Sequence, residues 1–174
     1  KKKSIILEVG FGMGDNLSHM ISNNKEMIFI GCDPYLNGIA NFISEIKECD
    51  YKRIKIYDRD VRILLDKLPE NLFSKIILLF PDPWLKRRHK KRRLFNANNI
   101  KLFLKVLKKN GEVYFGTDVD NYFNEVLDFF LKKKSIYMIK NKKEFTKIPD
   151  YICETKYAKK ALKKGVVPRY LVVK

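Results

Sequence analysis

The sequence contains few cysteines, a minority of acidic residues and no long hydrophobic run. Cys32, Cys49 and Cys153 lie far apart and form no C-x-x-C pair, so we expect neither a disulfide framework nor a zinc site. This cysteine usage is typical of the reducing cytoplasm. No apolar run approaches the roughly 18 residues that cross a bilayer. The stretch that follows Lys1 is interrupted by Glu8 and is too short for a secretion signal.

Acidic residues are outnumbered by basic ones, 20 Asp and Glu against 37 Lys and Arg, which gives a net charge of +17. A chain of 174 residues is long enough for one core, so we expect residues 1–174 to form a single domain. A composition that is 45% hydrophobic indicates a globular fold. A compositional bias toward lysine explains the diffuse part of the charge excess as well as a binding partner does. It explains the basic residues concentrated at 86–93 poorly.

The stretch at residues 80–93, F-P-D-P-W-L-K-R-R-H-K-K-R-R, is the most informative part of the chain. It follows an apolar run at 75–80 that predicts a buried strand. Prolines on both sides of Asp82 fix φ and withhold two backbone donors, so neither a helix nor a strand continues there. We therefore expect Asp82 on a stiff turn at the carboxyl end of a strand, the edge where open α/β sheets bind ligands.

Residues 86–93, called the basic arm below, hold seven Lys or Arg and one His. Such a run cannot be buried, and a polyanion relieves its mutual repulsion best. We expect it to contact RNA phosphates through Arg87, Arg88, Lys90, Lys91, Arg92 and Arg93. Lys86 is the arm residue nearest Asp82, and a specific contact there is as well supported as a solvated one. His89 is interpreted as a solvated residue, and Trp84 as packing beneath the loop rather than stacking on a base.

A glycine turn follows the apolar run at 5–9, with Gly10, Gly12 and Gly14 at alternate positions. Glycines allow backbone to approach a ligand where a Cβ would clash. A second predicted strand at 27–32 ends at Asp33, 23 residues after Gly10. This is close to the spacing of about 20 residues at which an acid meets a ribose diol in dinucleotide-binding folds.

Two acidic residues argue against a nicotinamide dinucleotide at this turn. Asp15 stands where the dinucleotide fingerprint requires a small residue, and Glu8 would face a pyrophosphate of its own sign. An acid-x-G-x-G-x-G turn suits a cofactor with a cationic end and no phosphates, namely S-adenosylmethionine. A nicotinamide oxidoreductase remains an alternative, although the sequence shows no hydride-transfer site.

The acids of the next loop, Asp58 and Asp60, follow a short strand expected at 54–57. Either side chain is a candidate for the exocyclic amine of adenine. Asp60 is equally well interpreted as the N-cap of a helix that begins at Val61, and the two roles do not exclude each other.

Strands alternate with helices along the chain, which predicts a mostly parallel sheet with helices on both faces. We expect about seven strands, at 5–9, 27–32, 54–57, 75–80, 112–117, 135–140 and 166–173. Helices are expected to begin at Asp15 and to span 36–49, 61–65, 99–109 and 119–131. Thr155 is a candidate cap for a further helix at 156–164.

Four segments together resemble the tRNA (guanine-N7-)-methyltransferase family: L-E-V-G-F-G at 7–12, residues 80–93, G-T-D at 116–118 and T-K-Y at 155–157. The resemblance covers essentially the whole chain, and the 80–93 signature is its most specific part. It implies an α/β, Rossmann-like class I methyltransferase that uses S-adenosylmethionine. The implied reaction is methylation of a guanosine at N7 in the variable loop of tRNA, in the cytoplasm and without a metal ion.

Carried over residue by residue, the resemblance implies three sets of site residues. The cofactor would be bound by Glu8, Gly10, Gly12, Gly14, Asp33, Asp60 and Asp82. Asp82 would also be catalytic, and the target nucleotide would contact Lys86, Asp118, Thr155 and Tyr157. The chain departs from the family at Ala158, where members usually have Glu, and in the residues that normally precede the first strand.

Guanine N7 carries a lone pair and no proton, so attack on a sulfonium methyl needs no general base. Asp82 or Asp118 would stabilise the positive charge that develops on the purine. A non-catalytic RNA-binding module would retain the basic arm but would need neither Glu8 nor Asp33. A methyltransferase of small molecules or proteins would leave the arm without a function. The sequence is compatible with a monomer and with a homodimer, and it predicts no membrane contact.

Overall fold

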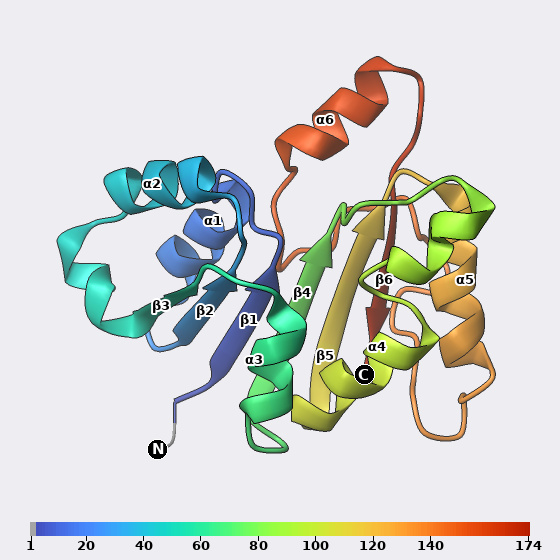
Figure 1. The fold of residues 1–174 in the computed structure, drawn as a ribbon, viewed down its shortest axis with the longest axis horizontal. Coiled ribbons are helices and arrows are strands. Elements are labelled where there is room, and N and C mark those ends of the chain that lie inside the picture. Colours follow the sequence, from blue (N-terminus) through green and yellow to red (C-terminus); the bar gives the residue numbers. More distant parts are fainter. Residues whose placement is uncertain (1–2) are drawn as a thin grey trace.

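The structure, a computed structural model, describes residues 3–174, so Lys1 and Lys2 of the stretch considered as a signal lie outside it. Within these residues a six-stranded sheet has the order β3-β2-β1-β4-β5-β6 (Figure 1). The strands are β1 (Ile5–Val9), β2 (Ile28–Cys32), β3 (Ile54–Tyr57), β4 (Phe73–Leu79), β5 (Leu107–Thr117) and β6 (Arg169–Val173). Neighbours are parallel except β5 and β6, which confirms the mostly parallel α/β sheet.

Helices cover both faces of the sheet (Figure 1). The α-helices are α1 (Asp15–Asn23), α2 (Leu36–Glu45), α3 (Val61–Lys67), α4 (Ala97–Val106), α5 (Asp120–Leu131) and α6 (Lys156–Lys163). Two 3-10 segments are η1 (Glu48–Arg53) and η2 (Arg87–Arg92). No helix within residues 3–174 has the length and apolar character needed to cross a bilayer.

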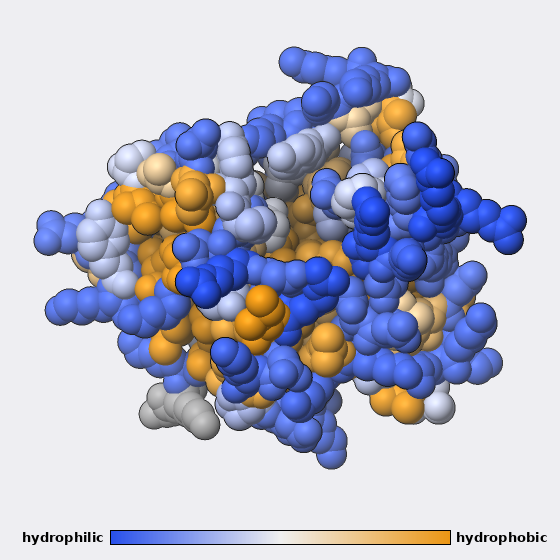
Figure 2. Space-filling view, viewed as in Figure 1, coloured by the Kyte–Doolittle hydropathy of each residue, from blue (hydrophilic) through white to orange (hydrophobic). Residues whose placement is uncertain are grey.

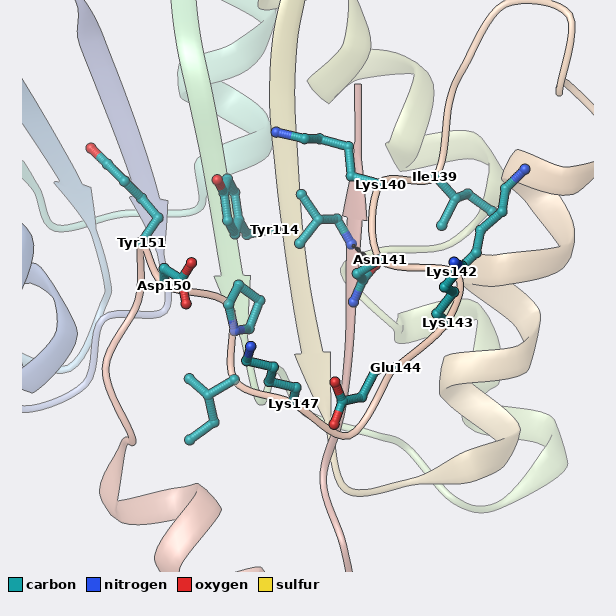
Figure 3. A pocket seen from close by; sticks show the side chains of 13 residues that line it. Tyr114, Ile139, Lys140, Asn141, Lys142, Lys143, Glu144, Lys147, Asp150 and Tyr151 are labelled. Atoms are coloured by element: carbon teal, nitrogen blue, oxygen red, sulfur yellow. Dashed lines mark hydrogen bonds between the residues drawn. The ribbon is translucent and has the colours of Figure 1, made fainter.

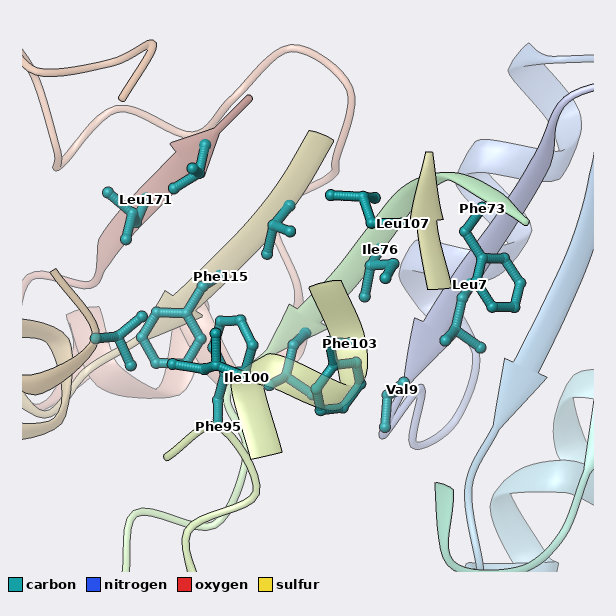
Figure 4. Close-up of a cluster of buried hydrophobic side chains, with 14 of the residues drawn as sticks. Leu7, Val9, Phe73, Ile76, Phe95, Ile100, Phe103, Leu107, Phe115 and Leu171 are labelled. Carbon is teal, nitrogen blue, oxygen red and sulfur yellow. The ribbon is translucent and has the colours of Figure 1, made fainter. Parts of the chain in front are cut away.

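Two buried clusters fill the space between the helices and the sheet. Successive residues of β1 point to opposite faces, so Ile6 packs with α1 and α2, whereas Leu7 packs with α3, α4 and α5. Figure 4 shows Phe95, Phe103 and Phe115 gathered between α4 and the sheet, and the rings of Phe95 and Phe103 meet edge to face at 5.5 Å. Because both faces are covered, the central strands are continuous apolar runs, as the sequence indicated.

The seventh strand, expected at 135–140, is absent from the described residues, and only Ile139 forms an isolated bridge to Val173. The side chain of Asn141 explains where pairing ends. Its Nδ2 donates to the Tyr170 carbonyl at 2.8 Å, and its Oδ1 accepts from the Val172 amide at 2.9 Å. This amide therefore takes the place of a backbone peptide along β6. Before it, the amides of Met138 and Lys140 still donate to the carbonyls of Lys174 and Val172 at 2.7 and 2.8 Å, so backbone pairing is limited to residues 138–140.

The helix expected at 99–109 ends earlier, at Val106, and β5 begins at the next residue. Leu107 is buried and pairs with Phe73 at the start of β4, so the core holds it in the sheet. Asn110 and Gly111, which follow the expected helix, form an irregularity within β5, where Asn110 has a φ of +65°. This left-handed residue interrupts a strand rather than ending a helix.

Candidate active site

The carboxyl ends of the strands surround a pocket of about 500 Å³ where the strand order reverses between β1 and β4. Such a switch point is where open α/β sheets bind ligands. Seven residues predicted from the sequence line it: Gly10, Gly12, Asp33, Asp60, Asp82, Arg92 and Tyr157. Figure 2 shows a hollow at this edge, with hydrophilic residues around it. The glycine turn and the proline-flanked acid, 72 residues apart between Gly10 and Asp82, thus face the same crevice.

The glycine turn extends β1 and then reverses the chain into α1. Gly10, Gly12 and Gly14 have φ values of +73°, +57° and +93°, which L side chains rarely adopt. Gly10 has open space where a Cβ would stand, whereas a Cβ on Gly14 would lie 2.5 Å from the Phe42 ring. Gly14 does not line the pocket, and it serves instead as the N-cap residue of α1. Gly14 therefore packs closely behind the turn, off the pocket lining, and its contact with the cofactor stays a prediction.

Asp33 stabilises the glycine turn from the end of β2. Its carboxylate accepts hydrogen bonds from the Gly12 amide at 2.7 Å and from the Tyr35 amide at 2.9 Å. The side chain is 7% exposed and lines the pocket. Each carboxylate oxygen has capacity for a further hydrogen bond, so Asp33 can hold the turn and accept from a ligand hydroxyl.

Glu8 does not line this pocket of about 500 Å³. It borders a cavity of about 20 Å³ beneath the turn, together with Thr155 and Lys156, and this is room for about one water. Oε1 accepts from Asn16 at 3.0 Å, and Oε2 is buried with no hydrogen-bond partner among residues 3–174. Burial raises the pKa of Glu8 to about 8, despite the hydrogen bond from Asn16. Gly10 lines both cavities, so the unpartnered oxygen lies beside the pocket that holds the other acids.

Asp58 and Asp60, the two candidates for a contact with adenine, differ in their placement. Asp60 lines the pocket, whereas Asp58 is absent from its lining and makes only a 4.0 Å pair with Arg59. Asp60 also caps α3, because its Oδ1 accepts from the Arg62 amide at 2.9 Å. The hydrogen bond from the Arg62 guanidinium lowers the pKa of this carboxyl below its usual value.

Asp82 lies between two aromatic residues with left-handed backbone conformations. Phe80 has a φ of +52° and Trp84 a φ of +42°, which are strained conformations for bulky residues and are typical of functional sites. The Phe80 ring stacks on Tyr157 with centroids 6.2 Å apart, and its amide donates to the Gly116 carbonyl at 2.7 Å. Asp82 itself is exposed and faces the pocket.

Trp84 lines the pocket beneath the guanidinium of Arg92, which lies 5.1 Å from its ring. His89 meets the same ring edge to face at 6.0 Å. These contacts favour packing for Trp84, and they place Arg92 over the pocket as well as in the basic arm.

Arg93 is the clearest correction to the sequence-based prediction. It was expected to contact phosphate, but it is 1% exposed. Its Nε donates to the Pro83 carbonyl at 2.8 Å, and its Nη1 lies 2.5 Å from Glu125 and 3.2 Å from Asn121. Tyr122 lies under the guanidinium at 4.5 Å. The only signal for burial was its place beside the apolar pair at 94–95.

The remaining basic arm is at the surface. Lys86, Arg87, Arg88, Lys91 and Arg92 are exposed, and Lys90 is half-buried, along η2. Within residues 3–174 no carboxylate forms an ion pair with any of these six side chains. Their charges are therefore available to an external anion.

Of the residues predicted to contact the target nucleotide, only some lie at the pocket. Tyr157 lines both cavities, but Asp118 is exposed after β5 and lines neither. Thr155 caps α6, accepting from the Ala158 amide at 3.3 Å, and borders the small cavity. Ala158 is fully buried, so its position faces the protein interior.

A larger cavity of about 690 Å³ lies elsewhere, against β5 and β6 (Figure 3). In the picture Lys140 and Tyr151 lie at one end of it, and Lys147 and Glu144 at the other. None of the predicted site residues lines it. Glu112 pairs with Lys75 and with Lys140, which lines this cavity. Burial alone would raise the pKa of Glu112, but the hydrogen bonds from the two lysines lower it to about 2. The pocket of about 500 Å³ at the switch point of the sheet is therefore the candidate active site.

No group of three or more metal-ligating side chains is placed to hold a metal ion within residues 3–174. The carboxylates of the pocket are instead arranged singly around its wall, each with its own backbone or side-chain partner or facing the pocket.

A family model described as "Putative methyltransferase" matches residues 2–168. A tRNA (guanine-N(7)-)-methyltransferase of Agrobacterium fabrum is 42% identical over 125 residues, which are 72% of this chain and 54% of that protein. One from Wolbachia pipientis wMel is 35% identical over 93% of this chain and 71% of its own length. A bifunctional methyltransferase of Rickettsia felis is 36% identical over 99% of this chain, which spans only 33% of that relative.

Solved structures share the fold at low identity. An rRNA methylase from Streptococcus thermophilus has a TM-score of 0.66 at 11% identity, over 99% of this chain and 86% of that one. The plantazolicin methyltransferase BpumL, solved in complex with SAH, has a TM-score of 0.63 at 13% identity, over 100% of this chain and 77% of that one. These likenesses confirm the fold of class I methyltransferases.

Proposed function

This chain belongs to the tRNA (guanine-N7-)-methyltransferase family, and we propose that it transfers a methyl group from S-adenosylmethionine to N7 of a guanosine in the variable loop of tRNA. One observation carries the proposal: the glycine turn, Asp33, Asp60 and Asp82 line one pocket at the switch point of the sheet. Free cysteines and a tRNA substrate support action in the cytoplasm.

The residues around the pocket fit this cofactor. A volume of about 500 Å³ lies within the range of small-molecule sites. Gly10 and Gly12 leave room for backbone to approach a ligand, while Asp33 and Asp60 offer acceptors suited to ribose hydroxyls and an adenine amine. The unpartnered oxygen of Glu8 supplies an acceptor for an ammonium group beside Gly10.

Bound S-adenosylmethionine supplies a methyl group on a sulfonium, which N7 of guanine attacks without losing a proton. The residues of this chain then act by positioning and by stabilising charge. Asp82 faces the pocket between two prolines, so its carboxylate accepts from the guanine N1–H and amino group as positive charge develops on the purine. Asp118 lies off the pocket lining, which favours Asp82 over Asp118 for this role.

The basic arm supplies the affinity for tRNA. Six of its cations lack an ion-pair partner within the described residues and lie on the segment that leads away from Asp82. Binding is therefore expected to weaken with salt, with a log–log slope of about −0.7 for each single-strand phosphate neutralised.

The direct test is incubation of the protein with unmodified tRNA and methyl-labelled S-adenosylmethionine, followed by nucleoside analysis. The proposal requires labelled 7-methylguanosine and its loss on substitution of Asp82. If the protein bound tRNA but failed to bind S-adenosylmethionine by calorimetry, it would be a non-catalytic RNA-binding module. Label in another nucleoside would support the use of S-adenosylmethionine but contradict methylation of guanosine.

A further inference from the structure

Helix α6 separates its residues into two faces. At 100° per residue, an arc of about 140° contains every lysine of the helix and its C-cap. These are Lys156, Lys159, Lys160, Lys163 and Lys164, all of them exposed. The remaining four residues, Tyr157, Ala158, Ala161 and Leu162, occupy the other side. Ala158 and Ala161 are 1% and 3% exposed and pack against the protein, whereas Tyr157 and Leu162 at the borders of this face are 47% and 46% exposed.

The lysine face carries an unbalanced charge. Residues 155–168 contain no Asp or Glu, and none of the five lysines forms an ion pair within residues 3–174. Three pairs of these lysines are spaced i,i+4 and two are spaced i,i+3, so each meets like charge on its own helix. Such pairs destabilise a helix in isolation. A compositional bias explains many lysines, but an anion bound along this face relieves their repulsion.

The position of α6 connects the lysine face with the active site. Tyr157 lines the pocket and stacks on Phe80 beside the proline-flanked acid. Figure 1 shows α6 lying across the carboxyl ends of the strands, and Figure 2 shows its hydrophilic surface bordering the hollow there. Trp84 and Arg92 of the loop and basic arm contribute other parts of the pocket wall. The pocket thus lies between two cationic elements from distant parts of the chain.

We infer that the lysine face of α6 is a second phosphate-binding surface, and that the RNA strand carrying the target guanosine passes between α6 and the basic arm. This inference rests on the proposed function for its RNA partner. A membrane surface is the less suitable partner, because an interfacial helix inserts a broad apolar face. On α6 the two alanines are buried and Tyr157 stacks on Phe80, so Leu162 is the large apolar side chain of the helix left to insert. The five lysines follow each other along the helix, which suits the repeated charges of a phosphodiester backbone.

The test compares two triple variants with the same change in net charge. The first carries Lys159→Gln, Lys160→Gln and Lys163→Gln on α6. The control carries Lys132→Gln, Lys133→Gln and Lys134→Gln just after α5, away from the pocket. Glutamine has a helix propensity close to that of lysine, so both variants should fold, as thermal melts and S-adenosylmethionine binding will verify. The affinity for an unmodified tRNA transcript is then measured over a series of salt concentrations.

We expect the α6 variant to bind tRNA about tenfold more weakly at low salt, with a log–log slope less steep by about 2 to 3. The control should retain the slope of the unmodified protein. Equal weakening of both variants would show a general charge effect, and no weakening of the α6 variant would leave the face without an RNA contact; either result overturns the inference. Binding to anionic vesicles that depends on α6, with tRNA binding unchanged, would assign the face to a membrane and also overturn it. Formation of 7-methylguanosine by the unmodified protein tests the proposed function independently.

Discussion

The guanidinium of Arg93 donates a hydrogen bond to the carbonyl oxygen of Pro83, 2.8 Å away and ten residues earlier in the chain. This bond closes the loop that carries the basic arm onto the turn that presents Asp82. The same side chain pairs with Glu125 and therefore connects the loop to α5. One buried arginine thus fixes the base of a segment whose other cations are at the surface.

Replacing Arg93 with lysine should lower the rate of methyl transfer by about tenfold or more, because a shift of the loop misplaces Asp82. A lysine keeps the charge but lacks the planar fork that reaches Pro83 and Glu125 together. Affinities for S-adenosylmethionine and tRNA should change little. Single-turnover rates, compared with binding constants measured separately, distinguish this effect from a lost phosphate contact.

The variant Glu125→Gln removes the charged partner of Arg93 on α5. It should also lower the rate of methyl transfer. A phosphate-binding Arg93 would instead tolerate lysine, since charge alone suffices for a phosphate. An unchanged rate in Arg93→Lys, in a variant that melts as a folded protein, would contradict the positioning role.

Asp82→Asn should reduce turnover by about 10²-fold to 10³-fold, the loss typical of removing one group that stabilises charge in a transition state. Because Asp82 is exposed, stability should stay within about 0.5 kcal/mol of the unmodified protein. S-adenosylmethionine affinity, measured by calorimetry, should fall far less than turnover.

Asp58→Asn is the matched control, because Asp58 is an exposed acid at the same edge of the sheet but off the pocket lining. Its turnover should be close to normal. Equal losses in both variants would point to a general effect of negative charge rather than to a contact made by Asp82.

Gly38→Ala separates helix propensity from packing. Alanine is the better helix former by about 1 kcal/mol, so propensity alone predicts a more stable α2. The added Cβ would, however, stand 2.1 Å from the Gly12 carbonyl oxygen, which is backbone and cannot rotate away. We expect the opposite sign, a lower free energy of unfolding and weaker S-adenosylmethionine binding, because α2 must move off the glycine turn.

Ala40→Gly supplies the control on the same helix. Ala40 is exposed, and glycine there should cost about 1 kcal/mol of stability without disturbing the turn. Cofactor affinity should fall in Gly38→Ala and not in Ala40→Gly. A Gly38→Ala protein that is more stable and binds the cofactor normally would refute the proposed contact.

Much of this site could be predicted from sequence, because turn chemistry is local. The positive φ of Gly10 and the prolines around Asp82 act within a few residues, and the strands before them are mostly apolar. Burial of Arg93 depends on Glu125, 32 residues later, and a run of cations gives no sign of such a partner. The end of backbone pairing after residue 140 likewise depends on the side chain of Asn141, which pairs with a strand near the C-terminus.

The buried carboxyl of Glu8 should make the stability of the protein depend on pH. Its pKa is raised from an ordinary value of 4.5 to about 8 in the folded chain, so the folded state binds this proton more tightly than the unfolded state does. The free energy of unfolding should therefore fall as pH rises between about 4.5 and about 8, by at most about 1.4 kcal/mol per unit. Urea denaturation at several pH values in this range measures the slope.

Glu8→Gln keeps a side chain of the same size and removes the titration, so its stability should vary less with pH over that range. Glu112→Gln is the matched control, because the pKa of Glu112 is lowered from 4.5 to about 2. The ion pairs of Glu112 contribute stability that is lost as pH falls from 4.5 toward about 2. Glu112→Gln should therefore leave the dependence of stability on pH between about 4.5 and about 8 unchanged. A Glu8→Gln protein with the unmodified slope would show that another group carries the proton.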